Sequence, residues 1–365
     1  MNICILIGTR PEIIKMAPLI RACDKKGLDY FILHTGQHYS YEMDRQFFID
    51  LELKEAKYNL NVGGKSYRKQ VGMMIREIMT VLEKEKPDIV FVQGDTNSVL
   101  AGALAANKLK INVGHHEAGL RSHDLTMLEE TNRIITDHIA DYLFAPTKDA
   151  LKNLIDEGID ERKVFLTGNT VVDSVIQNKR IAERKVDVLE EFGLEKGKYI
   201  VVTAHRAENV DIEKRLRGII KGLGLVHNET GMPIIYPIHP RTRKNMESFG
   251  IDVPEGVRLT DPIGYLKFLQ LEANSSIIIT DSGGLQEEAC ILKVPCVTVR
   301  DNTERPETVD AGINILAGTD PERILEYVKR MQKKTKEMSA DGWPTPFGDG
   351  KAGEKIIDVW LDEKR

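Results

Sequence analysis

Short apolar runs that alternate with stretches of helical periodicity are the feature that most restricts the fold of this 365-residue chain. Runs such as 88–92 and 277–280 lack the alternation of a half-exposed strand, as expected for parallel strands that are buried on both faces. Apolar residues with helical spacing fill the intervals, for example over 13–23 and 96–108. This repeated alternation predicts an α/β protein with open, doubly wound sheets.

The predicted strands fall into two groups. They cover 2–7, 30–34, 88–93, 111–114 and 141–144 in the first group, and 199–203, 233–237, 277–280 and 295–299 in the second. Residues 172–198 are rich in charge and helix formers and contain no strand pattern. We therefore expect an N-terminal domain over 1–170 and a C-terminal domain over 171–349, with a tail helix at 350–363 that packs back on the first. Ligands of such sheets bind at the carboxyl ends of the strands.

Composition excludes several classes of protein. The net charge is −5 and the pI about 6.1, which argues against a nucleic-acid or polyanion binder. The apolar N-terminus lacks a basic segment and leads directly into Gly8-Thr9-Arg10-Pro11, so it is predicted to be a buried strand rather than a signal peptide. No apolar stretch approaches the ~20 residues of a membrane span. Four cysteines without a CxxC pair fit a reducing, cytoplasmic setting.

The segment Asp281–Glu288 follows an apolar strand, contains Gly283 and Gly284, and opens a helix. Unpaired N–H groups at a helix N-terminus favour anions, and glycine lets a phosphate approach the backbone. Glu288 lies about one turn, or 5–6 Å, deeper, where a carboxylate suits ribose hydroxyls better than phosphate. The pattern predicts a nucleotide diphosphate site, although an ordinary βα turn would also place glycine here.

Polar residues follow several strands of the first half. Arg10 and Lys15 are one helical turn apart and would clamp a diphosphate, unless they are merely surface cations. Asp95 either caps the helix predicted from Thr96 or acts in catalysis. With Glu117 and Glu129, it forms a set of carboxylates suited to acid–base work. The adjacent histidines 115 and 116 lack the HExxH spacing and a clear third ligand, so no metal site is expected.

The second half carries its own polar residues at strand ends. His205 can donate to a phosphate or transfer a proton, and His239 lies between two prolines on a stiff segment. Arg305 precedes a proline and is therefore predicted to be non-helical. It either reaches toward a ligand from its loop or pairs with Asp301 and Glu304.

Taken together, these motifs match one family in order and spacing. They are Gly-Thr-Arg-Pro-Glu-x-x-Lys-Met-Ala-Pro at 8–18, Gly-Asp-Thr at 94–96, His-x-Glu-Ala-Gly-Leu-Arg at 115–121, Glu-Glu-x-Asn-Arg at 129–133, Thr-Gly-Asn-Thr at 167–170, Ala-His-Arg-x-Glu-Asn at 204–209, Asp-Ser-Gly-Gly-x-Gln-Glu-Glu at 281–288 and Thr-Glu-Arg-Pro-Glu at 303–307. The chain resembles the non-hydrolysing UDP-N-acetylglucosamine 2-epimerases over essentially its full length, including the tail Gly348-Asp349-Gly350.

The resemblance implies two Rossmann-like domains facing a cleft, as in GT-B glycosyltransferases. It implies reversible inversion at C2 between UDP-N-acetylglucosamine and UDP-N-acetylmannosamine, with no NAD and no obligatory metal. The family eliminates UDP to give 2-acetamidoglucal and then adds UDP back with C2 protonated from the other face. A homodimer in a polysaccharide pathway is also implied. A GT-B glycosyltransferase, a hydrolysing epimerase that releases N-acetylmannosamine and a non-catalytic sugar-nucleotide sensor are the alternatives.

The resemblance also implies roles for individual residues. For binding, it assigns the diphosphate to Arg10, His205, Ser282, Gly283 and Gly284, the ribose to Glu288, and the uracil to Phe268 and the backbone of Ile263. For catalysis, it assigns acid–base work to Asp95, Glu117, Glu129 and His205. Lys15 and Arg305 would complete the polar pocket. A second, activating substrate site would use Gln37, His38, Arg206 and His239. Leu128 stands where many relatives have proline, and Tyr39-Ser40-Tyr41 departs from the family's usual run.

Overall fold

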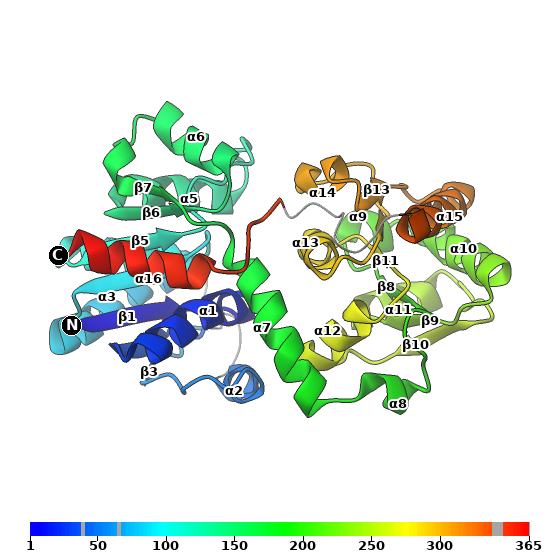
Figure 1. The fold of residues 1–365 in the computed structure, drawn as a ribbon, viewed down its shortest axis with the longest axis horizontal. Coiled ribbons are helices and arrows are strands. Elements are labelled where there is room, and N and C mark those ends of the chain that lie inside the picture. Colours follow the sequence, from blue (N-terminus) through cyan, green and yellow to red (C-terminus); the bar gives the residue numbers. More distant parts are fainter. Residues whose placement is uncertain (38–40, 64–66, 338–345, 365) are drawn as a thin grey trace. The chain divides into compact units, whose positions relative to one another are not determined.

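The computed structural model describes residues 1–37, 41–63, 67–337 and 346–364. It contains two compact units, drawn in Figure 1. The first comprises Met1–Ser174 together with Phe347–Arg365, and the second comprises Val175–Pro346. The second unit is therefore inserted, in chain order, between two parts of the first.

The first unit is built on a seven-stranded sheet in the order β3-β2-β1-β4-β5-β6-β7, with all neighbours parallel. The strands are β1 (Asn2–Ile7), β2 (Asp29–His34), β3 (Tyr58–Asn59), β4 (Ile89–Gln93), β5 (Asn112–His116), β6 (Tyr142–Ala145) and β7 (Val164–Leu166). The helices are α1 (Arg10–Lys26), α2 (Tyr41–Asp50), α3 (Tyr67–Glu85), α4 (Asn97–Lys108), α5 (Leu128–Ile139), α6 (Lys148–Asp156) and α16 (Ala352–Glu363), with a 3₁₀ turn η1 (Glu161–Lys163). Strand β4 lies in the middle of the sheet and is buried along its whole length. Such burial on both faces is expected where helices cover both sides of a parallel sheet.

The C-terminal helix α16 completes the core of the first unit. Trp360 is fully buried and meets Phe91 of β4 edge-on, with 6.2 Å between ring centroids. Gly353 lies so close to α1 that an added Cβ would come within 2.8 Å of the backbone of Pro18. The Asp173 carboxylate accepts hydrogen bonds from the N–H groups of Ala352 (3.2 Å) and Gly353 (2.9 Å). These contacts fix the start of α16, where the helix leaves its N–H groups unsatisfied.

The second unit contains a six-stranded parallel sheet in the order β10-β9-β8-β11-β12-β13. Its strands are β8 (Ile200–Thr203), β9 (Ile234–Pro237), β10 (Val257–Thr260), β11 (Ile277–Thr280), β12 (Cys296–Thr298) and β13 (Asn314–Leu316). Its helices are α8 (Val188–Phe192), α9 (Ala207–Val210), α10 (Glu213–Thr230), α11 (Pro240–Ser248), α12 (Tyr265–Ala273), α13 (Gly283–Leu292), α14 (Pro306–Asp310) and α15 (Pro321–Glu337), and α7 (Thr170–Lys185) carries the chain from the first unit into the second. Central strand β11 is wholly buried.

The predicted class, an α/β protein with two parallel doubly wound sheets, is confirmed. All nine strands that the sequence predicts are present, and each predicted boundary lies within two residues of the observed one. The sequence reading missed β3, β7, β10 and β13, and each of these is an edge strand. They are only two to four residues long, so none of them carries an apolar run of the four or more residues that would reveal a strand.

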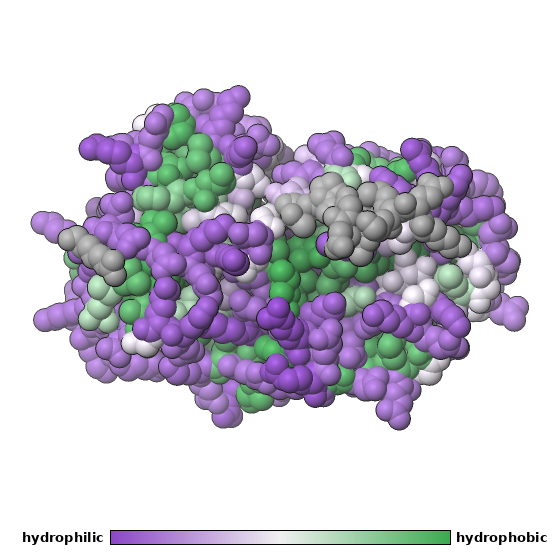
Figure 2. All heavy atoms as spheres, in the orientation of Figure 1, coloured by the Kyte–Doolittle hydropathy of each residue, from purple (hydrophilic) through white to green (hydrophobic). Residues whose placement is uncertain are grey.

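Hydrophilic residues cover most of the visible face of each unit (Figure 2), as expected when 29% of the residues are charged. None of the helices in the described ranges combines the length and apolar character needed to cross a bilayer.

Candidate active site

In the first unit, the turn after β1 is organised by Glu12. This carboxylate is 2% exposed and accepts hydrogen bonds from the N–H groups of Gly8 and Thr9 and from the hydroxyl of Thr96 (2.6 Å). Burial raises the pKa of Glu12 to about 7, although these hydrogen bonds oppose the shift. Glu12 thereby joins the turn that carries Arg10 to the loop that carries Asp95.

Arg10 is oriented by groups from α2. Its Nε lies 3.1 Å from Oδ1 of Asp44, and its guanidinium lies over the ring of Phe47, 5.2 Å from the centroid. The other oxygen of Asp44 lies 3.3 Å from Nε2 of the fully buried His34. Because Asp44 is itself 1% exposed, this ion pair fixes the guanidinium at the end of β1. The sequence reading did not assign a role to Asp44 or His34.

Glu117 stands directly after β5 in a strained conformation. It has a φ of 62°, which lies in the left-handed region that non-glycine residues rarely adopt. Its carboxylate is nearly buried, and Nζ of Lys15 lies 2.7 Å from Oε1, while the Gln93 amide donates to Oε2. Both partners are donors, which suits an ionised carboxylate that can only accept. Lys15 and Glu117, two of the predicted site residues, are thus in direct contact.

Asp95 does not cap α4, so that interpretation of it is wrong. Thr96 is the N-cap, and its side chain accepts from the N–H of Val99 (3.4 Å). The Asp95 carboxylate instead forms an ion pair with Arg133, and its carbonyl accepts from the side chain of Asn132 (2.9 Å). Asp95 therefore faces α5 at the carboxyl end of β4.

The neighbouring histidines of β5 do not converge on a common ligand site. Both ring nitrogens of His115 are used: Nδ1 lies 2.6 Å from Asp137 and Nε2 lies 2.8 Å from the Gly94 carbonyl. His116 is buried, which lowers its pKa to about 4. Successive residues of a strand point to opposite faces, so the two rings are directed apart. His115 instead supports the backbone just before Asp95.

Glu129 and Glu130 have opposite environments at the start of α5. Glu130 is 1% exposed and accepts from the N–H groups of Ser122 (3.0 Å) and His123 (2.9 Å) and from Arg133. Glu129 is exposed. The structure therefore brings Lys15 and Glu117 together and ties Asp95 to α5, but leaves Glu129 at the surface of the unit.

In the second unit, a buried carboxylate holds the loop after β8. Asp281 is fully buried and accepts from the N–H groups of His205 (3.0 and 3.1 Å) and Arg206 (2.9 Å) and from the side chain of Asn209 (3.1 Å). The His205 ring is 49% exposed, with Nδ1 3.3 Å from Asp281. Asp281 therefore orients His205 while leaving its outer ring edge open to a ligand.

The N-terminus of α13 has the form expected of an anion site. Ser282 is its N-cap, and the serine side chain makes no capping hydrogen bond. A Cβ at Gly283 would come within 2.6 Å of Oε1 of Glu304, whereas Gly284 is exposed. Glu304 is also held by Arg206 and by Arg300. A carboxylate thus already approaches this helix end, and a side chain at position 283 would force the end of the Glu304 side chain to shift.

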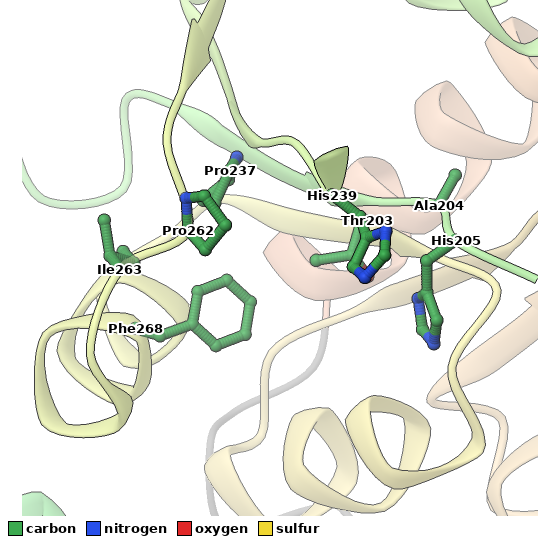
Figure 3. Close-up of a pocket in the computed structure, with 8 residues that line it drawn as sticks. All are labelled: Thr203, Ala204, His205, Pro237, His239, Pro262, Ile263 and Phe268. Atoms are coloured by element: carbon green, nitrogen blue, oxygen red, sulfur yellow. The ribbon is translucent and has the colours of Figure 1, made fainter. Parts of the chain in front are cut away.

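A cavity of about 310 Å³ opens at the carboxyl ends of β8 and β9. In Figure 3, Pro262, Ile263 and Phe268 lie toward one end and His205 and His239 toward the other. Thr203, Ala204 and Pro237 complete the lining. Nδ1 of His239 accepts from the N–H of Arg241 (3.2 Å), so Nε2 carries the proton when the ring is neutral. The cavity combines an aromatic ring that suits a base with imidazoles that suit an anion.

Arg305 occupies a non-helical position, as predicted. It is the N-cap of α14 with φ −126° and ψ 59°, and its Nε lies 2.8 Å from Glu287 of α13. The alternative, in which Arg305 pairs with the carboxylates of Asp301 and Glu304, is not what the structure shows. Asp301 pairs with Arg215 (2.9 Å), and Glu304 pairs with Arg206 and Arg300.

The residues of the predicted second site are divided between the units. Gln37 belongs to the first and is 7% exposed, with its Oε1 accepting from the N–H (3.0 Å) and the hydroxyl (2.7 Å) of Ser98. His38 lies outside the described residues. Arg206 and His239 belong to the second unit, and His239 lines the same cavity as His205 and Phe268. The side chain of Gln37 already has a structural role beside α4.

Two doubly wound parallel sheets, with polar residues at the carboxyl ends of the strands, define the class as a GT-B-like α/β protein. A UDP-N-acetylglucosamine 2-epimerase from Methanocaldococcus jannaschii is 51% identical to this chain over 365 residues, covering 98% of each. The crystal structure of the Methanocaldococcus jannaschii UDP-GlcNAc 2-epimerase in complex with UDP-GlcNAc and UDP matches with a TM-score of 0.83 at 51% identity, over 99% of this chain and 100% of that one.

A more distant relative is the UDP-2,3-diacetamido-2,3-dideoxy-D-glucuronate 2-epimerase of Pseudomonas aeruginosa, 39% identical over 361 residues, 98% of this chain and 99% of that protein. The family model described as UDP-N-acetylglucosamine 2-epimerase matches residues 21–361. The chain belongs to the UDP-N-acetylglucosamine 2-epimerase family.

Proposed function

We propose that this protein interconverts UDP-N-acetylglucosamine and UDP-N-acetylmannosamine by inversion at C2, without hydrolysing the sugar nucleotide. The observation that carries the proposal is the cavity beside His205 and Phe268 in the second unit, whose lining suits a uridine nucleotide. The 51% identical relative is described in complex with UDP-GlcNAc and UDP, which supports the same ligand here.

The proposed binding residues are those that the family resemblance assigns, and the geometry of the second unit supports several of them. Phe268 and the backbone at Ile263 contact the uracil, while His205 and the α13 N-terminus at Ser282–Gly284 hold the diphosphate, which helix N-terminal N–H groups favour. Glu288, one turn further along α13, accepts hydrogen bonds from the ribose hydroxyls. Arg10 and Arg305 add charge that stabilises the leaving diphosphate.

The chemistry follows from the position of the proton that must move. The C2 hydrogen is not α to a carbonyl, so direct deprotonation is very unfavourable. Elimination of UDP across C1 and C2 forms 2-acetamidoglucal, and re-addition with C2 protonated from the other face gives the epimer. Glu117, paired with Lys15 and Gln93, is in the form that accepts a proton from C2. Asp95, Glu129 and His205 complete the acid–base set.

The same proposal includes substrate activation through Gln37, His38, Arg206 and His239, assembly as a cytoplasmic homodimer and a place in polysaccharide synthesis. These parts rest on the family resemblance of the motifs. Sedimentation of the purified protein would test the dimer.

The deciding experiment is NMR of the products formed from UDP-N-acetylglucosamine in D₂O. We expect UDP-N-acetylmannosamine, with deuterium at C2 of both epimers and no need for NAD or metal. Retention of hydrogen at C2 over many turnovers would contradict the elimination. Free N-acetylmannosamine would indicate a hydrolysing epimerase, transfer to an acceptor a glycosyltransferase, and binding without turnover a sensor.

A further inference from the structure

Glu272 is a buried carboxyl group that the proposed chemistry leaves unexplained. It lies near the end of α12, is 0% exposed, and neither of its carboxyl oxygens accepts a hydrogen bond from an N–H or O–H donor of the described chain. Helix α12 packs against α13, and the Glu272 carboxyl group is in hydrogen-bonding contact with the carboxyl group of Glu288. Glu288 is the residue proposed above to bind ribose.

Two carboxyl groups in such contact share a proton, because two like charges at hydrogen-bonding distance, one of them fully buried, strongly disfavour ionisation of both. Burial, together with the neighbouring Glu288, raises the pKa of Glu272 well above its ordinary value. Glu272 is fully buried whereas Glu288 is partly exposed. The proton therefore resides on Glu272, and Glu288, the more exposed of the two, keeps its charge.

The other groups around Glu272 do not supply an alternative partner. Tyr199, just before β8, uses its hydroxyl to donate to the Leu271 carbonyl (2.6 Å). The buried thiol of Cys296 on β12 lies 3.9 Å from the hydroxyl of Thr298. The pKa values of both residues are raised chiefly by burial and also by the nearby Glu272. No Lys, Arg or His of the described chain forms an ion pair with Glu272.

We propose that Glu272 is a positioning residue for nucleotide recognition: as a neutral carboxylic acid it donates a hydrogen bond to Glu288 and fixes that carboxylate toward the ribose hydroxyls. This inference rests on the proposed function, since it deepens the role given to Glu288. Glu288 accepts the hydrogen bond that the Glu272 proton makes and keeps its negative charge for the ribose hydroxyls. The arrangement makes recognition of ribose depend on a proton that never contacts the ligand.

The test compares Glu272→Leu and Glu272→Gln by calorimetric titration with three ligands: UDP, 2′-deoxy-UDP and inorganic pyrophosphate. Glu272→Leu removes the donor and is expected to weaken UDP about tenfold, the scale for a lost hydrogen bond to a charged group. It should leave pyrophosphate unchanged and reduce the preference for UDP over 2′-deoxy-UDP. The Gln amide still donates, so Glu272→Gln should restore UDP binding. Gln270→Leu, on the same helix, is the matched control and should bind UDP normally.

A second measurement reports the proton itself. Infrared difference spectra should show a protonated carboxylic acid in the wild type that is absent in Glu272→Gln. Because the folded pKa of Glu272 is raised above its ordinary 4.5, the stability that its neutral form contributes is complete below pH 4.5 and falls as the pH rises. Thermal melts should therefore show Glu272→Gln gaining stability relative to the wild type as the pH rises.

The outcomes separate this inference from the proposed function. Normal UDP binding and normal ribose preference in Glu272→Leu would overturn the positioning role, as would failure of Glu272→Gln to restore binding. Absence of the protonated acid from the infrared spectrum would contradict the inference that Glu272 and Glu288 share a proton. Failure of the wild type to bind UDP at all would instead contradict the proposed function. The infrared and stability measurements would still test whether Glu272 is protonated.

Discussion

The two units use the carboxyl ends of their parallel strands in different ways. In the first unit, candidate site residues are held by charged or amide side chains: Lys15 and Gln93 hold Glu117, and Arg133 holds Asp95. In the second, a buried carboxylate, Asp281, binds backbone N–H groups and leaves His205 beside an open cavity. Side-chain networks suit proton transfer, where orientation and charge decide the rate, whereas backbone clamps and a cavity suit binding. Substitutions in the first unit should therefore change kcat, and those in the second should change affinity.

The largest effect is expected in the first unit. Asp95→Asn, Glu117→Gln and Glu129→Gln should each lower kcat by at least ~10²-fold, the usual contribution of a general acid or base. Steady-state kinetics and UDP titration should show that UDP affinity changes little. Glu77→Gln, at a half-buried position of α3 that pairs with Arg76, is the control and should be fully active. A variant that loses UDP binding in parallel with kcat would break the division between the units.

Activation by substrate is the next largest effect. The enzyme should be slow with pure UDP-N-acetylmannosamine, and a trace of UDP-N-acetylglucosamine should remove the lag, because a ligand that favours the competent state raises its population. Arg206→Ala and His239→Ala should reduce this activation while binding of UDP is retained. Because His239 also lines the cavity, UDP affinity must be measured for this variant separately. Hyperbolic kinetics without a lag would show that the second site is lost.

A smaller effect is expected from the second unit. Glu288→Ala should weaken UDP by about 1–3 kcal/mol, the range for loss of a charged hydrogen-bond partner, with kcat at saturation less affected. Isothermal titration measures the change, and Glu326→Ala on the exposed face of α15 serves as the matched control. Normal UDP affinity in Glu288→Ala would contradict the ribose assignment.

The smallest effect concerns the pH dependence of stability in the first unit. Burial raises the folded pKa of Glu12 from 4.5 to about 7. The folded state therefore holds a proton that the unfolded state has released, so the contribution of Glu12 is complete below pH 4.5 and is lost as the pH rises to about 7. Glu12→Gln cannot titrate, so the stability advantage of the wild type over this variant should shrink across that interval. A difference in melting temperature between the wild type and Glu12→Gln that does not change with pH would contradict the raised pKa of Glu12.

Sequence patterns predict those features, such as strands and motifs, that are formed by residues adjacent in the chain. The central strands are visible because burial on both faces leaves unbroken apolar runs. Motif residues such as Asp95 and Ser282 are visible because they follow such runs. Edge strands such as β10, with one buried position in four, carry no comparable pattern.

Partners distant in the chain were not predictable. Asp44 holds Arg10, Asp281 holds the backbone of His205, and Glu272 contacts Glu288. Each pairing depends on which loops or helices become neighbours in the folded sheet. For the same reason the sequence could not distinguish the exposed Glu129 from the buried Glu130.

The docking of the last helix into the first unit has a consequence for how the protein is made. Trp360 packs beside Phe91, and it is synthesised only after translation has passed the entire second unit. Domains generally fold as they leave the ribosome, in order from the N-terminus. Here the second unit is fully synthesised before the first, because the core of the first unit includes the C-terminal helix α16. A chain that ends before this helix would contain every residue of the second unit but would lack part of the core of the first.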